Sequence, residues 1–165
     1  MFGRLRRLYR MPAPPRVLVV DDHPIVLEGV RNALAPLPAT VEVAIDPETA
    51  ISMLEEREFD LAILDISFRN SNLTGYDILR SCRRAHPHLP VLMASVFDDE
   101  WIQDAAWREG ASGFISKGKA DSVWREAARA LLGGGTSFHF LPRKKARSQG
   151  LTPTELEVAH CWQMG

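Results

Sequence analysis

Five short apolar runs recur along the chain, and polar residues end or follow four of them. The runs are residues 17–20, 41–44, 61–64, 91–94 and 113–116. Their length, their β-branched content and their nearly continuous hydrophobicity are typical of strands that are buried on both faces of a parallel sheet. We therefore predict five strands at these positions.

Segments with apolar residues at helical spacing lie between and after these runs, and several have clear start or stop signals. Asp46 and Pro47 fit the N-cap and first position of a helix, and acidic residues at 98–100 suit the positive end of another. Further helices are predicted at 76–85 and at 121–132, where Gly133–Gly135 ends the segment. The inward-facing residues are expected to be Ile25, Leu27, Val30 and Leu34 in a first helix near Pro24, and Ala50, Ile51, Met53 and Leu54 in the second.

Five strands that alternate with five helices over about 120 residues indicate an α/β fold with a doubly wound five-stranded parallel sheet. Crossover connections in such sheets are right-handed, so helices cover both faces. Ligands bind at the carboxyl ends of the strands, near the point where the strand order reverses. The residues that follow each strand are therefore the first candidates for a functional site.

Charged and hydroxyl side chains follow four of the five strands. Asp21 and Asp22 come after the first, and the third ends at Asp65. Ser95 ends the fourth, and Lys117 follows the fifth. Taken singly, each has an ordinary explanation, such as a helix cap or a solvated lysine.

Taken together at one edge of the sheet, three carboxylates would repel each other and lose solvation, so stability alone does not explain them. They offer the hard oxygen ligands that Mg²⁺ prefers. A carboxylate beside Mg²⁺ can attack phosphorus to form an aspartyl phosphate. The ammonium of Lys117 and the hydroxyl of Ser95 could then bind the phosphoryl oxygens. We therefore predict a phosphoacceptor site.

The overall composition is that of a globular protein, with 45% hydrophobic and 25% charged residues. It excludes collagen-like, disordered and disulfide-scaffold chains. No apolar run approaches the roughly 18 residues of a membrane span, so no membrane association is expected. Cys82 and Cys161 lack metal-type spacing, and reduced thiols in the cytoplasm are expected.

The net charge of −1 hides an acidic body between two basic segments. Residues 1–10 carry four arginines and no acid, and residues 143–147 carry four basic side chains. Residues 11–142 carry 12 basic and 19 acidic side chains, which argues against nucleic-acid binding by the body itself. The first ten residues fit a tail, an arm that touches a membrane or nucleic acid, or a segment upstream of a start at Met11.

Four motifs resemble the receiver domain of bacterial two-component response regulators, which has a flavodoxin-like fold. The motifs lie at 19–24, 62–65, 92–95 and 110–117, and the resemblance covers about residues 16–135. His23-Pro24 and Ser116-Lys117-Gly118 look most like the NarL/FixJ subfamily. Residues 151–158 resemble the opening of the LuxR-type helix-turn-helix domain that follows such receivers.

The resemblance implies a role for each matching residue. Asp65 would be phosphorylated, and Asp22, Asp65 and the backbone carbonyl of Ser67 would bind Mg²⁺ directly, with Asp21 acting through water. Lys117 would pair with the phosphoryl group. Ser95 would move toward that group and Phe114 would follow inward, which would remodel the surface around the fourth helix and fifth strand.

The resemblance also divides the chain into four parts. A basic extension at 1–15 precedes the receiver domain at 16–135, a linker follows at 136–150, and residues 151–165 begin a truncated helix-turn-helix domain. DNA binding is expected only of a full-length form, because the helices that reach the major groove are missing here. Such a truncation could be natural or made in the laboratory.

The loop after Asp65 departs from the family pattern. A proline usually stands four residues after the phosphoacceptor and a glycine about eight after it, whereas this chain has Arg69 and, ten residues on, Gly75. The loop at 67–74 is therefore about two residues longer and more polar. We expect the change to affect phosphoryl lifetime and kinase docking, while Asp65 keeps its role as phosphoacceptor.

The main hypothesis is a cytoplasmic, Mg²⁺-dependent response regulator that accepts a phosphoryl group from a sensor histidine kinase, dimerises and controls transcription. It is expected to be no enzyme beyond its own phosphorylation and dephosphorylation. One alternative is a pseudo-receiver that acts as an interaction module without phosphotransfer. Another is a phosphatase, which is disfavoured because Ser67 stands where such enzymes commonly carry a second aspartate.

Overall fold

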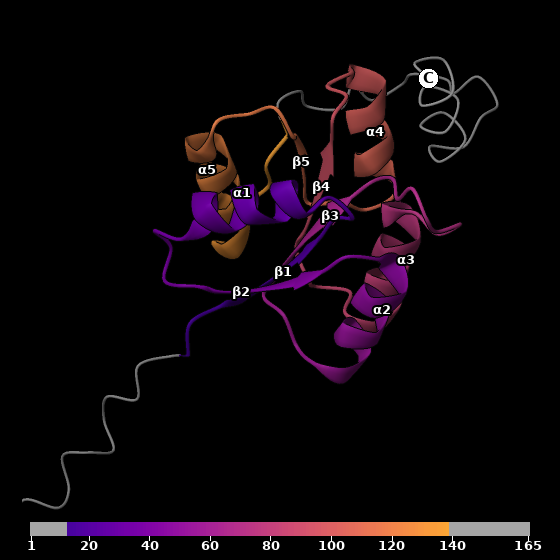
Figure 1. Cartoon of the computed structure of the whole chain (residues 1–165), viewed down its shortest axis with the longest axis horizontal. Helices are drawn as coiled ribbons and strands as arrows, with labels where there is room; N and C mark the ends of the chain where they lie inside the picture. Colours follow the sequence, from indigo (N-terminus) through magenta and orange to yellow (C-terminus); the bar gives the residue numbers. More distant parts are fainter. Residues whose placement is uncertain (1–12, 139–165) are drawn as a thin grey trace, which may run out of the picture.

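A computed structural model describes residues 13–138, which form a three-layer α/β domain (Figure 1). Its strands are β1 (Arg16–Val20), β2 (Thr40–Ala44), β3 (Leu61–Asp65), β4 (Val91–Ser95) and β5 (Gly113–Ser116). Its helices are α1 (Pro24–Leu34), α2 (Pro47–Glu56), α3 (Gly75–Ala85), α4 (Glu100–Arg108) and α5 (Asp121–Leu132). The predicted order of elements is confirmed.

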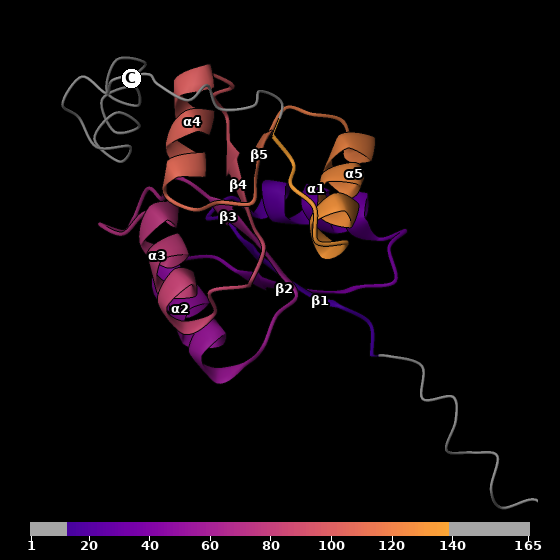
Figure 2. The same cartoon turned by 180° about the vertical axis from the view of Figure 1, so that it is seen from behind.

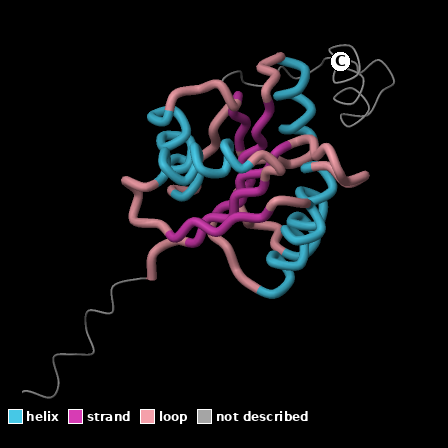
Figure 3. The backbone as a smooth tube through the Cα atoms, viewed as in Figure 1, coloured by secondary structure: helices cyan, strands magenta, loops and turns pink. Residues whose placement is uncertain are grey.

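All five strands are parallel and lie in the order β2-β1-β3-β4-β5. The order reverses at β1, which lies between β2 and β3, so the carboxyl ends of β1 and β3 flank the switch point. Helices α1 and α5 cover one face of the sheet, and α2, α3 and α4 cover the other (Figures 2 and 3). The doubly wound parallel sheet predicted from the sequence is thus confirmed.

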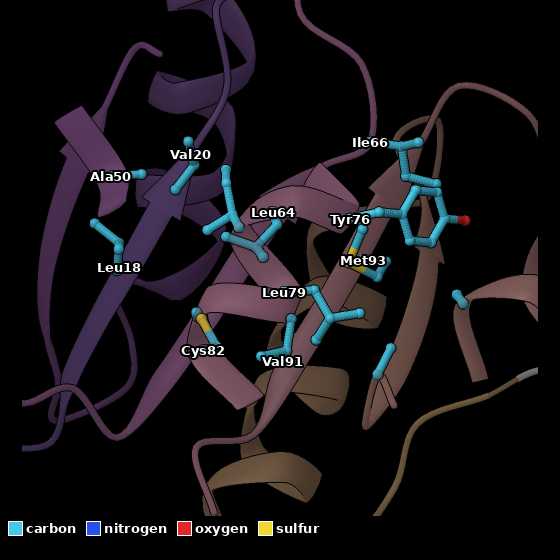
Figure 4. Close-up of a cluster of buried hydrophobic side chains, with 14 of the residues drawn as sticks. Leu18, Val20, Ala50, Leu64, Ile66, Tyr76, Leu79, Cys82, Val91 and Met93 are labelled. Carbon is cyan, nitrogen blue, oxygen red and sulfur yellow. The ribbon is translucent and has the colours of Figure 1, made fainter. Parts of the chain in front are cut away.

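Alternation along the buried strands sends successive side chains into two separate cores. On β1, Leu18 and Val20 face α2 and α3, whereas Val17 and Val19 face α1 and α5. Figure 4 shows the first of these cores, where the labelled strand residues meet those of α2 and α3. Each buried aliphatic or aromatic side chain contributes about 1.5–3 kcal/mol, so both cores hold the strand ends in fixed positions.

The predicted capping signals are borne out at α2, but the inward stripe of α1 needs one correction. Asp46 accepts hydrogen bonds from the backbone N–H and the hydroxyl of Thr49, at 2.7 and 2.9 Å. Ile25, expected in the core, is 80% exposed, whereas Leu27 is buried. Residues two apart on a helix point in nearly opposite directions, so Ile25 and Leu27 cannot share a face.

Three of the four expected residues of α1 are buried, namely Leu27, Val30 and Leu34. On α2, Ala50 and Leu54 are buried, and Ile51 and Met53 are half-buried against the same core. The sheet-facing sides of both helices therefore follow the predicted spacing, apart from Ile25.

The chain just after α5 turns back along the free edge of β5. Ser137 donates its backbone N–H to Ser112 and accepts that of Phe114, at 3.0 and 2.7 Å. The ring of Phe138 packs edge-on against Trp107 of α4, with centroids 5.2 Å apart. The first residues of the predicted linker thus cover the edge of β5.

Among residues 13–138, no helix is long and apolar enough to span a membrane. The basic extension up to residue 12, most of the linker and the predicted helix-turn-helix segment lie outside the described residues. The predictions for those segments stay predictions.

Candidate functional site

Two buried carboxylates and one largely buried ammonium, from three separate segments, meet at the carboxyl edge of the sheet. Asp21 follows β1, Asp65 ends β3 and Lys117 follows β5. The ammonium Nζ of Lys117 lies 2.6 Å from Oδ2 of Asp21 and 2.7 Å from Oδ2 of Asp65. Lys117 thus neutralises part of a carboxylate pair that would otherwise be buried without a counter-charge.

The pKa of the Asp65 carboxyl is raised to about 6. Burial is the main cause, because it removes the water that stabilises the carboxylate. The positive charge of Lys117 opposes this rise in pKa, and the negative charge of Asp21 adds to it. The positive charge of Lys117 therefore does not offset the effects of burial and of Asp21 on Asp65. A further cation at Asp65 would stabilise its ionised form.

His23 and Asp22, which are more exposed, lie beside this cluster. The imidazole Nδ1 of His23 lies 3.0 Å from Asp21 Oδ1 and 2.7 Å from Asp22 Oδ1, and both contacts are ion pairs when the ring is protonated. The backbone N–H of His23 also donates to Asp21 Oδ1 at 2.9 Å. Sequence reasoning used His23 only as a subfamily marker, although its place next to Asp21 and Asp22 could have indicated a site residue.

The residues present fit a divalent cation. One ligand atom from each of Asp21, Asp22, His23 and Asp65 lies within 4.8 Å of every other. Within residues 13–138, Oδ1 of Asp22 is buried and accepts no hydrogen bond, so this oxygen could serve as a ligand for a cation. Three carboxylates form a donor set suited to Mg²⁺.

Ser67 and Gly75 keep the loop after β3 close to Asp65. The backbone N–H of Ser67 donates to Asp65 Oδ1 at 3.5 Å. A Cβ atom at Gly75 would overlap the backbone carbonyl oxygen of Asp65, so the first turn of α3 can approach β3 only with glycine there. The glycine thus packs directly against the backbone of the aspartate.

Arg69, in the same loop, reaches back to Asp22. Its backbone N–H donates to Asp22 Oδ2 at 3.0 Å, and its side-chain Nε lies 3.5 Å from the same oxygen. The pKa of Asp22 is lowered: burial would raise this pKa, but the Arg69 hydrogen bond and the charges of His23 and Arg69 outweigh it. The sequence identified Arg69 as a departure from the pattern but did not predict this contact.

The predicted switch residues, Ser95 and Phe114, belong to β4 and β5. Ser95 is buried at the end of β4, and its hydroxyl oxygen accepts the backbone N–H of Phe97 at 3.1 Å. The backbone N–H of Lys117 donates to the carbonyl of Ser95 at 2.7 Å, which ties the β4 and β5 ends together. Phe114 is buried within the core that faces α2, α3 and α4.

The structure therefore brings together most of the predicted site. Asp21, Asp22, Asp65 and Lys117 form one cluster with Ser67 at its rim, and Ser95 is joined to it through the backbone of Lys117. Phe114 lies inside the core rather than in the cluster. His23 and Arg69 are the two neighbours that sequence reasoning did not place there.

Comparisons with known proteins agree on one family. The family model described as "Response regulator receiver domain" matches residues 17–129. The chain is 30% identical over 126 residues to the transcriptional regulatory protein DegU of Brevibacillus brevis, covering 75% of this chain and 52% of DegU. It is also 30% identical over 128 residues to the fimbriae Z protein of Salmonella typhimurium, covering 76% and 60%.

Among solved structures, the receiver domain of NtrX from Brucella abortus is similar in fold, with a TM-score of 0.67 and 30% sequence identity. The match covers 71% of this chain and 98% of that domain. The chain spans only about half to three-fifths of the two curated relatives above, 52% and 60% of their lengths. The similarity therefore concerns one domain of those longer proteins.

Proposed function

Because the chain belongs to the response regulator receiver domain family, we propose that it is a phosphoacceptor of a two-component system and that Asp65 accepts the phosphoryl group. The observation that carries the proposal is Lys117, whose ammonium lies within 2.7 Å of both Asp21 and Asp65 in a buried cluster. This arrangement leaves a carboxylate whose ionised form needs one more cation.

The proposed metal ligands are Asp22, Asp65 and the backbone carbonyl of Ser67, with Asp21 acting through water. When bound, Mg²⁺ would supply positive charge that stabilises both the Asp65 carboxylate and the oxygens of the incoming phosphoryl group. Burial keeps bulk water away from Asp65, which is 3% exposed. The same burial strengthens every charge interaction inside the site.

In the proposed transfer, an Oδ atom of Asp65 attacks the phosphorus of a phosphohistidine on a sensor kinase. An O–P bond forms to Asp65 as the P–N bond to the histidine breaks, and the departing imidazole keeps the bonding pair and takes up a proton. Lys117 then trades its contact with the Asp65 carboxylate for one with a phosphoryl oxygen. Its second partner, Asp21, keeps the ammonium in position throughout.

The proposed switch uses the tie between β4 and β5. Movement of the Ser95 hydroxyl toward a phosphoryl oxygen would break its bond with the Phe97 N–H and pull on the chain after β4. Phe114 sits in the core beside this segment, so repacking of its ring would carry the change to the surface of α4 and β5. In a longer protein, dimerisation and transcription control would be the output.

The test is phosphorylation by a small phosphodonor such as acetyl phosphate, followed by measurement of intact mass. We expect a gain of one phosphoryl group that requires Mg²⁺, is absent in Asp65→Asn and is present in Asp60→Asn. Asp60 is a matched control because it precedes β3 and therefore lies at the opposite edge of the sheet. No gain, together with no Mg²⁺ binding, would favour the pseudo-receiver instead.

A further inference from the structure

We propose that Arg69 is an internal competitor of Mg²⁺: it holds the Asp22 carboxylate until the metal displaces it, and so sets the metal affinity of the site. This inference rests on the proposed function, since it concerns the same metal. It assigns a positioning role to a residue of the β3–α3 loop that the proposed transfer itself does not use.

Arg69 offers two donors to a single oxygen of Asp22. The backbone N–H lies 3.0 Å from Oδ2 and the side-chain Nε lies 3.5 Å from it. The other oxygen, Oδ1, lies 2.7 Å from the imidazole of His23. Oδ2 therefore already accepts two donors from Arg69, and a metal ion that binds Asp22 competes with the Arg69 guanidinium for the negative charge of this carboxylate.

The ion pair between the Arg69 guanidinium and Asp22 can break at small cost. The side chain of Arg69 is 67% exposed, whereas that of Asp22 is 12% exposed. The neighbouring Phe68 is buried and anchors the loop, so the guanidinium can leave without the backbone leaving. An arginine that swings into water regains its hydration, which keeps the cost of displacement small.

Lys117, at the same site, differs from Arg69 in its burial. It is 9% exposed and is shared between two buried carboxylates, so its removal would leave those charges unpaired. Arg69 instead pairs with the acid at the rim. Lys117 thus stays within the buried cluster, whereas Arg69 is a cation that the metal can replace at Asp22.

The competition has a consequence for the loop. Since Mg²⁺ weakens the hold of Arg69 on Asp22, Arg69 must weaken the binding of Mg²⁺ by the same factor. Metal binding would therefore release the side chain of Arg69 into solvent, while the buried Phe68 keeps the backbone of the loop in place. The metal state of the site would in this way be transmitted to the surface of the β3–α3 loop.

The test is a Mg²⁺ titration followed by backbone amide NMR shifts of the full chain, without any phosphodonor. Three variants are compared with the unchanged protein: Arg69→Gln, Arg69→Pro and Arg57→Gln. Arg69→Gln removes the charge, and Arg69→Pro also removes the N–H. Arg57 follows the last turn of α2, away from the site, and provides the matched control.

We expect Arg69→Gln to bind Mg²⁺ about two- to fivefold more tightly, the range for an exposed ion pair. Arg69→Pro should bind more tightly still, and Arg57→Gln should match the unchanged protein. At about 0.5 M NaCl the advantage of Arg69→Gln should shrink, because salt screens an exposed pair. Urea unfolding checks that each variant is folded. If Arg69→Pro is unfolded, the Mg²⁺ affinity of Arg69→Gln alone tests the inference.

Equal or weaker Mg²⁺ binding by Arg69→Gln would overturn the inference; weaker binding would show that Arg69 supports the metal site. If neither the unchanged protein nor any variant bound Mg²⁺, the proposed function would fall together with the inference. Binding by the unchanged protein with no gain in Arg69→Gln would overturn the inference alone. The two failures are therefore distinguishable.

Discussion

Two lysines stand two residues apart in the loop between β5 and α5, and they make the same chemical contact in different surroundings. Lys117 is 9% exposed and lies 2.6 and 2.7 Å from two buried aspartates. Lys119 is 33% exposed and lies 3.0 Å from Asp98, which is itself 38% exposed. Burial, and not the distance between the charges, separates the two.

The difference decides what each lysine can do. Breaking a buried ion cluster leaves unpaired charges that water cannot reach, whereas an exposed pair exchanges readily for hydration. Lys117 therefore controls the charge state of Asp65, because its ammonium stabilises the Asp65 carboxylate. Lys119 connects its loop to the loop before α4, where Asp98 also accepts a hydrogen bond from the buried Gln103 at 3.2 Å.

The largest predicted effect tests the buried lysine. Replacing Lys117 with methionine should lower the free energy of unfolding by about 3–5 kcal/mol at pH 8, because Asp21 and Asp65 lose their shared cation. The loss should be smaller at pH 5, where Asp65 is largely protonated. Urea unfolding followed by tryptophan fluorescence, with a chelator present, measures both values. An equal loss at the two pH values would contradict the electrostatic explanation.

The second prediction concerns the pH dependence that Asp65 imposes. Its pKa is about 6 in the folded protein and near the ordinary 3.8 in the unfolded chain. Between about pH 4 and 6 the folded state binds more protons, so Asp65 lowers stability as the pH rises through this window. The full penalty, on the order of 2–3 kcal/mol, is then present above pH 6.

Asp65→Asn should remove this contribution, so the metal-free variant should be more stable than the unchanged protein at pH 8 and similar to it near pH 4. Taking the difference between the two proteins cancels the titration of the other carboxylates. A difference that is independent of pH would contradict the raised pKa of Asp65.

The smallest predicted effect tests the exposed lysine. Lys119→Met should lower the free energy of unfolding by about 0–1 kcal/mol, the usual range for a solvated pair. This change should fade in high salt, whereas that of Lys117→Met should persist. The same urea titrations, repeated at low and high NaCl concentration, measure both. If Lys119→Met lowered the free energy of unfolding as much as Lys117→Met, burial would not explain the difference between the two lysines.

Much of the fold could be predicted because its strands are buried on both faces. Such strands are continuous apolar runs, and each of the five was found within one residue at either end. The cap of α2 at Asp46 was also readable, because capping depends on a few neighbouring residues. The prediction for Ile25 was wrong because this residue, although apolar, lies two positions before the buried Leu27 and therefore on the opposite side of α1.

The sequence by itself determined the parallel sheet and the polar residues at its carboxyl edge, since local hydrophobic patterns dictate both. Only the tertiary structure decided which of these polar groups touch. The contact of Arg69 with Asp22 joins residues 47 positions apart, and no local pattern encodes it. Lys117 likewise differs from Lys119 through burial, which arises only when distant strand ends pack together and exclude water.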